Sequence, residues 1–243
     1  HRNLANRYFH GSYGQSIYQT ETAFAAFDDG PPRHVSEKEQ AEYAVQQYLT
    51  TLRESYLDID AKMFWYLWVD NYASVPSNPW ALTGVLRYTL APKPSYLAVR
   101  NLSDLIEGAE TVGALPAEDR LAITVFRRGS TPLIAAWSNS TPGKARLTLG
   151  KPAVTLVDLY GNRTEVATRG GVLELPVGSS TIYILGADPK TVYAQALRSQ
   201  MLRLCNELSF VEDPTAKPIT ARLRSAANRL GKTDDHSELA AIA

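Results

Sequence analysis

The sequence predicts an α/β region, then an all-β region, and then a helical extension. Two β-like runs near the N-terminus are separated by an amphipathic helical segment, a pattern typical of parallel strands joined by a helix. Seven short runs between turn residues follow, and they predict an antiparallel β-sandwich. The last part of the chain returns to helical periodicity. We place the three regions at residues 1–107, 108–187 and 188–243.

The composition is that of an ordinary globular protein. The 243 residues are 44% hydrophobic, and 25 Lys and Arg residues balance 25 Asp and Glu residues. Because the chain has no net charge, no overall field favours nucleic acid or an anionic membrane, and we expect neither partner. No apolar run approaches the roughly 18 residues that a membrane span needs. A neutral ligand such as a sugar fits this balance without being required by it.

No pattern in the sequence indicates a metal or a cofactor. Cys205 is the only cysteine, so an internal disulfide is excluded, and no Cys/His spacing resembles a metal site. The sequence contains neither a G-x-G-x-x-G run after a strand nor a phosphate-binding loop. We interpret Cys205 as a small apolar side chain on a helix, with a reactive thiol as the alternative. The histidines are scattered, and we assign them no role: His1, His10, His34 and His236.

The first β-like run, residues 16–24, ends in a carboxylate. Glu21 lies near its C-terminal end, and in parallel α/β architectures that end of a strand is where binding and catalytic groups gather. The preceding residues 1–9 are interpreted as the end of a helix. A strand carrying His10 and Tyr13 is the alternative, but too few residues separate it from the next run to hold a helix.

A helix and a second strand are predicted next. Ser36 and Glu39 form a capping box that starts a helix ending near Tyr56. The run Met63–Val69 is apolar on both faces, as expected of a parallel strand covered on both sides. Its end offers groups that bind sugars, because aromatic rings stack on pyranose faces while carboxylates and amides bind hydroxyls. The candidates are Trp68, Asp70, Asn71 and Tyr72, with Trp80 on the following loop; the alternative places Trp65 and Trp68 in the core.

The rest of the chain is predicted from turns and periodicity. Pro92-Lys93-Pro94 precedes a helix over residues 95–106. Trp137 is expected between two sheets, and Tyr160-Gly161-Asn162 is expected to form a hairpin turn. The predicted strands are Leu121–Phe126, Leu133–Ser138, Ala145–Leu149, Val154–Leu159, Glu165–Ala167, Val172–Leu175 and Thr181–Leu185.

The C-terminal region is predicted to contain two helices. Asp188 and Pro189 form an N-cap and N1 pair for the first helix. Its apolar residues form a single stripe, which docks either on the chain's own sandwich or on another subunit of a homo-oligomer. We expect a linker bounded by Pro214 and Pro218, and then a basic amphipathic helix from Ile219 to Leu230. The stripe consists of Tyr193, Leu197, Met201, Leu204 and Leu208.

These segments, in this order, resemble the last two β/α units of a TIM-barrel glycoside hydrolase and its appended sandwich domain. The resemblance is to the large clan whose retaining members carry the nucleophilic Glu at the end of strand seven. It covers about residues 1–105. The matching motifs are Thr20-Glu21-Thr22, Phe64-Trp65-Tyr66 followed by Asp70, and Gly84-Val85-Leu86 before Pro92-Lys93-Pro94-Ser95-Tyr96.

The resemblance implies a glycoside hydrolase that acts by double displacement on an oligo- or polysaccharide, with Glu21 as nucleophile. A retaining enzyme needs a second carboxyl group about 5–5.5 Å away, and the clan carries it on strand four. Residues 1–105 supply two of eight β/α units, since each takes about 30 residues. We therefore expect an upstream polypeptide that completes the barrel. The family favours a secreted or periplasmic location.

Two alternatives stay open. Glu21 can instead be a structural carboxylate at a strand end, paired with an Arg or capping a loop. The whole chain can instead be a non-catalytic carbohydrate-binding or assembly protein, in which the sandwich and the C-terminal helices are the working parts. A second carboxylate close to Glu21 would favour the enzyme.

Overall fold

The computed structural model describes residues 16–26, 35–55, 60–71, 79–117, 120–210 and 215–230. The chain forms two compact units, His1–Val99 and Arg100–Ala243, and each is described by itself. The histidines and the predicted helix end at residues 1–9 lie outside the described residues. Within the described residues, no helix has the length and apolar character that crossing a membrane requires.

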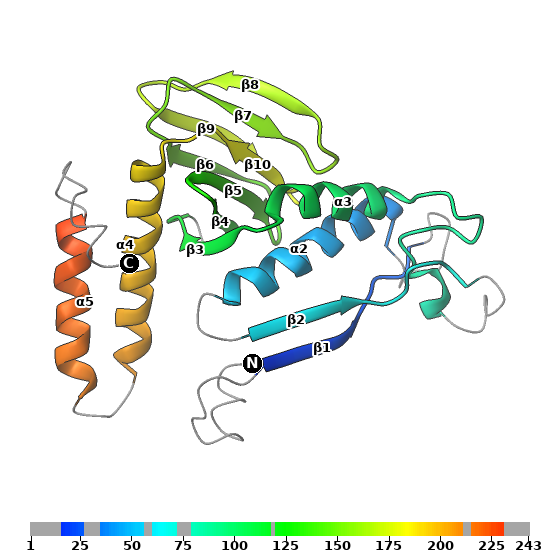
Figure 1. The fold of residues 1–243 in the computed structure, drawn as a ribbon, viewed down its shortest axis with the longest axis horizontal. Coiled ribbons are helices and arrows are strands. Elements are labelled where there is room, and N and C mark those ends of the chain that lie inside the picture. The colour runs from blue at the N-terminus through cyan, green and yellow to red at the C-terminus, as the bar shows by residue number, and fades with distance from the viewer. Residues whose placement is uncertain are drawn as a thin grey trace. The chain divides into compact units, whose positions relative to one another are not determined.

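The first unit contains a parallel pair of strands with a helix between them in sequence (Figure 1). Strand β1 (Ser16–Thr22) pairs in parallel with β2 (Asp60–Trp65), in the order strand, helix, strand that the sequence pattern predicts. The unit continues with the 3-10 helix η2 (Pro79–Leu82) and the first part of α3 (Pro94–Ile106). The carboxyl ends of β1 and β2 therefore lie at the same edge of the sheet.

Helix α2 (Glu37–Ser55) joins the two strands and begins at the predicted capping box. The Glu39 carboxylate accepts the Ser36 N–H at 2.8 Å, and the Glu39 N–H donates to the Ser36 hydroxyl at 3.2 Å. This carboxylate is a hydrogen-bond acceptor, so its pKa is lowered, chiefly by the Ser36 N–H. The predicted apolar face is buried at Ala41, Ala44, Val45 and Leu49.

The second strand ends earlier than predicted. We expected a strand from Met63 to Val69, whereas β2 ends at Trp65. The Tyr66 N–H still donates to the Thr22 carbonyl at 2.9 Å, but Trp68 and Asp70 then exchange backbone hydrogen bonds with Leu86. Because the backbone partner changes, the alternation of side chains stops at this point. In a continuous strand Trp68 and Asp70 would share one face, but Trp68 is exposed and Asp70 is buried.

The second unit is built from antiparallel sheets that share one core. Among the described residues, one sheet has six strands in the order β3-β4-β5-β10-β7-β8, and the other pairs β6 with β9. Apolar residues of both sheets, together with Val192 and Ala196, form the core. The strands are β3 (Glu110–Ala114), β4 (Leu121–Arg128), β5 (Thr131–Ser138), β6 (Gly143–Thr148), β7 (Ala153–Val157), β8 (Arg163–Ala167), β9 (Val172–Val177) and β10 (Ile182–Leu185).

Every predicted strand of this region overlaps an observed one, but β3 was not predicted. Its sequence, Glu110 to Ala114, contains Gly113 and lacks a clear alternation of apolar and polar residues. Trp137 is buried in β5, as expected, and its indole N–H donates to the Asn139 side chain at 2.8 Å. Between β7 and β8, the Asp158 carboxylate accepts the N–H groups of Tyr160 and Asn162, each at 2.9 Å, which stabilises the predicted turn.

The C-terminal helices contact each other, and α4 also packs on the chain's own core. Helix α4 (Pro189–Leu208) begins at the predicted N-cap, where the Asp188 carboxylate accepts the Thr191 N–H at 2.9 Å. We expected one apolar stripe, but α4 contacts both β3 and α5, so it is buried on more than one side. Its buried residues are Val192, Ala194, Ala196, Met201 and Cys205. Docking through these helices onto another subunit stays a prediction.

Helix α5 (Ala216–Leu230) begins three residues before the predicted start at Ile219. Pro218 lies in its first turn rather than in a linker, and Pro is tolerated there because N–H groups of the first turn have no partner within the helix. The Arg198 guanidinium donates to the Ala227 carbonyl at 3.2 Å, which links α4 to α5. Cys205 is buried on α4, with its thiol 3.5 Å from the Thr220 carbonyl oxygen, consistent with a small side chain between helices.

Candidate functional site

A cavity of about 430 Å³ opens at the carboxyl end of β1 in the first unit. Glu21 contributes to it from β1, Tyr66 from the residue after β2, and Trp80 from η2. Two of the residues predicted from the sequence, Glu21 and Trp80, thus line the same cavity. The described residues that line it are Gln19, Glu21, Thr22, Ala23, Phe24, Gln47, Tyr66 and Trp80.

The Glu21 side chain is exposed within this cavity. Among the described residues, no hydrogen bond or ion pair engages its carboxylate, so neither an Arg partner nor a capped loop accounts for it there. Glu21 is also the one carboxylate among the described residues that line the cavity. A carboxylate that is open to a cavity can contact a ligand without first breaking a contact within the protein.

Two aromatic side chains of the cavity are solvent-accessible. Trp80 is 55% exposed and Tyr66 is 36% exposed. The Tyr66 N–H donates to the Thr22 carbonyl at 2.9 Å, which fixes Tyr66 beside the end of β1. Exposed aromatic rings next to a carboxylate and the amides of Gln19 and Gln47 match the chemistry of a sugar site.

Tyr66 and Gln47 are site residues that sequence reasoning missed. Tyr66 was placed within the predicted strand Met63–Val69, whereas it follows the end of β2; it was not selected, although its aromatic ring near a strand end was a usable signal. Gln47 lies on α2, where nothing in the helical pattern distinguishes a glutamine that reaches a cavity from one in solvent. Only the placement of α2 against the strands reveals it.

The other predicted substrate-binding residues are not among those that line the cavity. Trp68 is 63% exposed, and its ring meets Tyr96 edge-on at a centroid distance of 6.0 Å, so the alternative that places it in the core is wrong. Asn71 is exposed, and its backbone N–H donates to the Ala81 carbonyl at 2.7 Å. Tyr72 lies outside the described residues. Substrate contacts by these three residues stay predictions.

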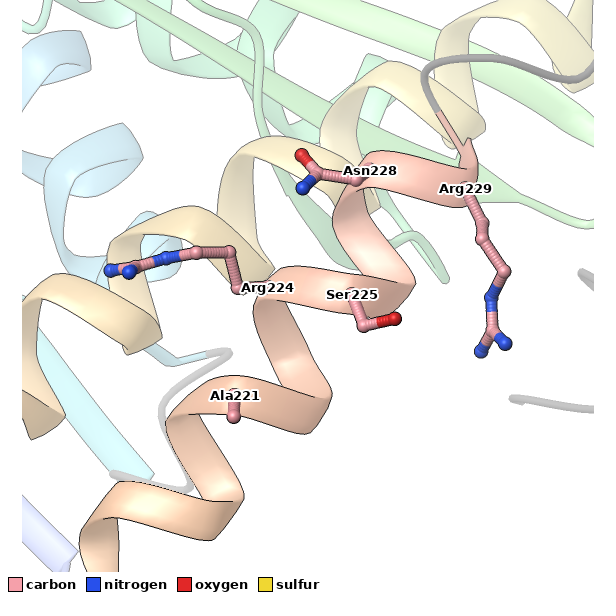
Figure 2. A pocket seen from close by; sticks show the side chains of 5 residues that line it. All are labelled: Ala221, Arg224, Ser225, Asn228 and Arg229. Carbon is pink, nitrogen blue, oxygen red and sulfur yellow. The ribbon is translucent and has the colours of Figure 1, made fainter.

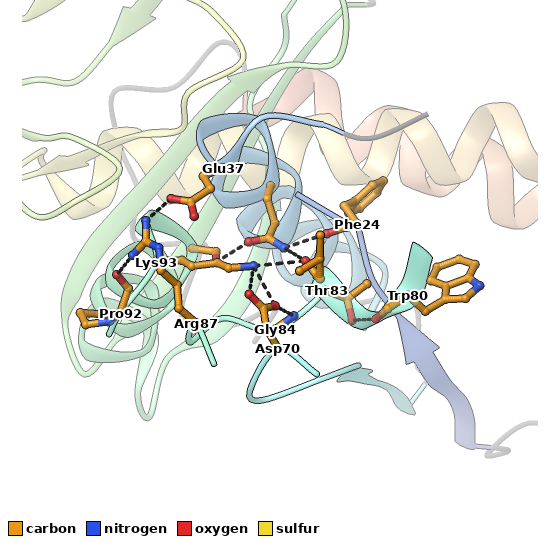
Figure 3. Close-up of polar contacts among 12 residues, drawn as sticks. Phe24, Glu37, Asp70, Trp80, Thr83, Gly84, Arg87, Pro92 and Lys93 are labelled. Carbon is orange, nitrogen blue, oxygen red and sulfur yellow. Dashed lines mark hydrogen bonds and ion pairs between the residues drawn. The ribbon is translucent and has the colours of Figure 1, made fainter. Parts of the chain in front are cut away.

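Asp70 has a different environment from the one expected. Its carboxylate lies 2.8 Å from the Lys93 ammonium and accepts the Gly84 N–H at 2.9 Å (Figure 3). Asp70 is 4% exposed and Lys93 is 2% exposed. Burial raises the pKa of the Asp70 carboxyl, while the hydrogen bond and charge of Lys93 act against that rise. These contacts are structural, so we do not place Asp70 in the substrate site.

A second cavity, of about 530 Å³, lies against α5 in the second unit and has a different chemical character (Figure 2). Arg224 and Arg229 extend to opposite sides of the helix, with Ser225 and Ala221 between them. The described residues that line it are Ala221, Arg224, Ser225, Asn228 and Arg229. They include neither a carboxylate nor an aromatic ring, so the groups that make the first cavity suited to sugar chemistry are missing from this lining.

Comparison of the sequence with models of known protein families finds no match, and comparison with curated proteins finds none either. Comparison with solved structures does find similar folds. A family 39 glycoside hydrolase from the gut symbiont Bacteroides cellulosilyticus is 21% identical, with a TM-score of 0.58, over 70% of this chain and 33% of that chain.

Weaker likenesses are found to a family 30 endoxylanase from Clostridium papyrosolvens and to an Anoxybacillus α-amylase. The endoxylanase is 12% identical with a TM-score of 0.48, over 74% of this chain and 44% of that chain. The amylase is 14% identical with a TM-score of 0.44, over 77% of this chain and 42% of that chain. The chain thus spans about a third to under half of the structures it matches. The likeness to the family 39 enzyme shows that the chain shares the fold of part of a glycoside hydrolase.

Proposed function

We propose that this chain carries the nucleophile of a retaining glycoside hydrolase that acts on an oligo- or polysaccharide. The observation that carries the proposal is the cavity at the carboxyl end of β1 and β2, which brings the exposed Glu21 carboxylate together with Trp80 and Tyr66. The shared fold with part of a glycoside hydrolase supports it. The clan of the resemblance, with its nucleophile on strand seven, belongs to the same proposal.

In this mechanism the Glu21 carboxylate attacks the anomeric carbon while the leaving-group oxygen receives a proton from a general acid. The bond from the anomeric carbon to the leaving oxygen breaks, and a glycosyl ester of Glu21 forms. Water then attacks the same carbon, deprotonated by the former acid, and releases the sugar and the free carboxylate. The rings of Trp80 and Tyr66 hold the sugar by stacking on its C–H faces.

The second carboxyl group must lie about 5–5.5 Å from Glu21. We propose that an upstream polypeptide completes the barrel and supplies this acid/base. The strand pair supports this proposal: among the described residues, β1 and β2 pair only with each other, and Phe64 on β2 is 52% exposed. An additional strand at an open edge would satisfy backbone groups and cover apolar surface.

The test is Glu21→Gln in the protein that contains this chain, assayed on a panel of 4-nitrophenyl glycosides. The change keeps the size and polarity of the side chain but removes the nucleophile, so kcat should fall by more than about a thousandfold. Glu165→Gln, a change at an exposed carboxylate on β8, is the matched control and should leave kcat unchanged. Turnover by Glu21→Gln within a few-fold of wild type would contradict the assignment.

A non-catalytic carbohydrate-binding protein is the second candidate. It is favoured by the finding that Glu21 is the one carboxylate among the described residues that line the cavity. In that case Trp80→Ala would weaken sugar binding, measured by calorimetric titration, while the wild-type protein would show no hydrolysis for Glu21→Gln to remove. An enzyme would bind sugar more weakly in Trp80→Ala and would lose hydrolysis in Glu21→Gln.

A further inference from the structure

The loop that carries Trp80 into the cavity is fixed by a buried polar network. Among the described residues, the Leu82 carbonyl, at the end of η2, accepts hydrogen bonds from three donors. These are the Ala26 N–H at 3.1 Å, the Gln40 amide at 3.4 Å and the Lys93 ammonium at 3.2 Å. One carbonyl therefore ties η2 to the residues after β1, to α2 and to the segment before α3.

Asp70 holds the same segment from its other end. Its carboxylate accepts the N–H of Gly84, two residues beyond Leu82, and binds Lys93. A Cβ atom at Gly84 would lie 2.4 Å from the Asp70 nitrogen and 2.8 Å from its carboxylate oxygen, so this contact requires a glycine. Lys93 thus binds the Leu82 carbonyl directly and is linked to Gly84 through Asp70, so the pair reaches the residues on both sides of Thr83.

Thr83 connects this network to the backbone of Trp80. The Thr83 hydroxyl donates to the Trp80 carbonyl at 2.8 Å, and the Trp65 indole N–H donates to the Thr83 carbonyl at 2.9 Å. Figure 3 shows the Trp80 ring pointing away from this network while its backbone belongs to it. The exposed ring therefore faces away from the network, whereas the backbone that carries it is held by these hydrogen bonds.

We infer that the Asp70–Lys93 pair is a positioning device that holds the Trp80 ring in the cavity that Glu21 also lines, and that Lys93 sets substrate affinity through Trp80. The effect on substrate affinity rests on the proposed function, whereas the positioning of Trp80 by the Asp70–Lys93 pair does not. The sequence motif Pro92-Lys93-Pro94 then has a role beyond starting α3: the buried Lys93 between two prolines clamps the loop of the site.

The first measurement follows the indole N–H signals of the ¹⁵N-labelled protein, assigned by single Trp→Phe changes. Lys93→Met keeps the length of the side chain and removes its charge. It should shift or broaden the Trp80 signal and leave the Trp137 signal, which reports on the second unit, in place. Arg87→Met is the matched control, because Arg87 lies near Lys93 in sequence but pairs with Glu37 of α2, and it should leave the Trp80 signal unchanged. An unchanged Trp80 signal in Lys93→Met would overturn the inference.

The second measurement is a double-mutant cycle on KM for the best 4-nitrophenyl glycoside. Lys93→Met should raise KM by about three- to tenfold, the scale of an aromatic contact, with a smaller change in kcat. In the Trp80→Ala background the same change should have no further effect on KM, because its target is gone. A purely structural role would give additive effects, and additive effects would overturn the inference.

Two outcomes are kept distinct by this design. If Glu21→Gln retains full turnover while Trp80 responds to Lys93→Met, the proposed function fails and the positioning device stands. If Glu21→Gln is inactive while the Trp80 signal is unchanged in Lys93→Met, the proposed function stands and the positioning device fails. Should Lys93→Met unfold the first unit, seen as collapse of the Trp65, Trp68 and Trp80 signals together, Asp70→Asn replaces it, since Asn keeps an acceptor for the Gly84 N–H. Its Trp80 signal then decides in the same way.

Discussion

The two units of the chain are stabilised by different means. In the second unit, apolar side chains of both antiparallel sheets and of α4 enclose one core, and six consecutive residues of β4 are buried. In the first unit, Phe64 on β2, Trp68 beyond its end and Trp80 on η2 are exposed, and buried polar pairs such as Asp70–Lys93 hold the loops. The candidate site thus lies in the unit that keeps aromatic rings exposed, whereas the apolar side chains of the second unit close its core.

The largest effect is expected from separating the two regions. Residues 111–243 should fold alone and unfold cooperatively, because their core is closed by their own side chains. Residues 1–105 should be insoluble or molten, because open strand edges and exposed aromatic rings favour aggregation. Size-exclusion chromatography and thermal unfolding followed by circular dichroism test both. If residues 1–105 were monodisperse and melted cooperatively, both regions would fold independently and the predicted difference between them would be wrong.

Two tryptophans sharpen the comparison at the level of single residues. Trp137→Ala should lower the free energy of unfolding by about 3–5 kcal/mol, because it empties a buried site in β5. Trp68→Ala should cost less than about 1.5 kcal/mol, because its ring is largely exposed and loses chiefly the edge contact with Tyr96. Urea unfolding of each variant gives the two values. Equal losses would mean that Trp68 is part of a core after all.

A smaller effect is expected at the start of α4. Asp188→Ala should cost about 1 kcal/mol at pH 7, because the carboxylate caps the helix, whereas Asp188→Asn should retain most of the stability. The hydrogen bonds from the Thr191 hydroxyl and N–H lower the pKa of the folded-state carboxyl below its unfolded value. This stabilisation is therefore present above the unfolded pKa of about 4 and is lost as the pH falls through the lower folded pKa.

The difference in the free energy of unfolding between wild type and Asp188→Ala should accordingly become smaller on acidification. Urea unfolding at pH 7 and at a pH below the folded pKa measures it, with Glu165→Gln as a control carboxylate change on β8. A difference that stays constant over this range would show that the cap does not depend on the charge of Asp188.

Local patterns in the sequence predicted much of this fold. The capping box at Ser36 and Glu39 and the N-cap at Asp188 act within three residues of sequence, so the residues alone reveal them. The strands of the second unit were predicted because turn residues and alternation repeat along the chain. Glu21 and Trp80 were selected from their position at a strand end and on the following loop, and both line the cavity.

The polar network of the first unit could not be predicted in the same way. The Ser95 hydroxyl donates to the Gln40 amide oxygen at 2.8 Å across 55 positions of sequence, and Asp70 pairs with Lys93 across 23. No periodicity in the sequence predicts such a contact, because a polar or charged residue considered alone is expected at the surface. Asp70 was therefore assigned to substrate, and Lys93 was treated as part of a turn.

The central claim is that Glu21 is the nucleophile in this cavity, and covalent trapping tests it most directly. The protein that contains this chain is incubated with activated 2-deoxy-2-fluoro glycosides, which slow the second step, and its peptides are analysed by mass spectrometry. We expect one fluoro-sugar on the peptide that contains Glu21, and none in the Glu21→Gln variant. A label on a different carboxylate, or hydrolysis without any label at Glu21, would contradict it.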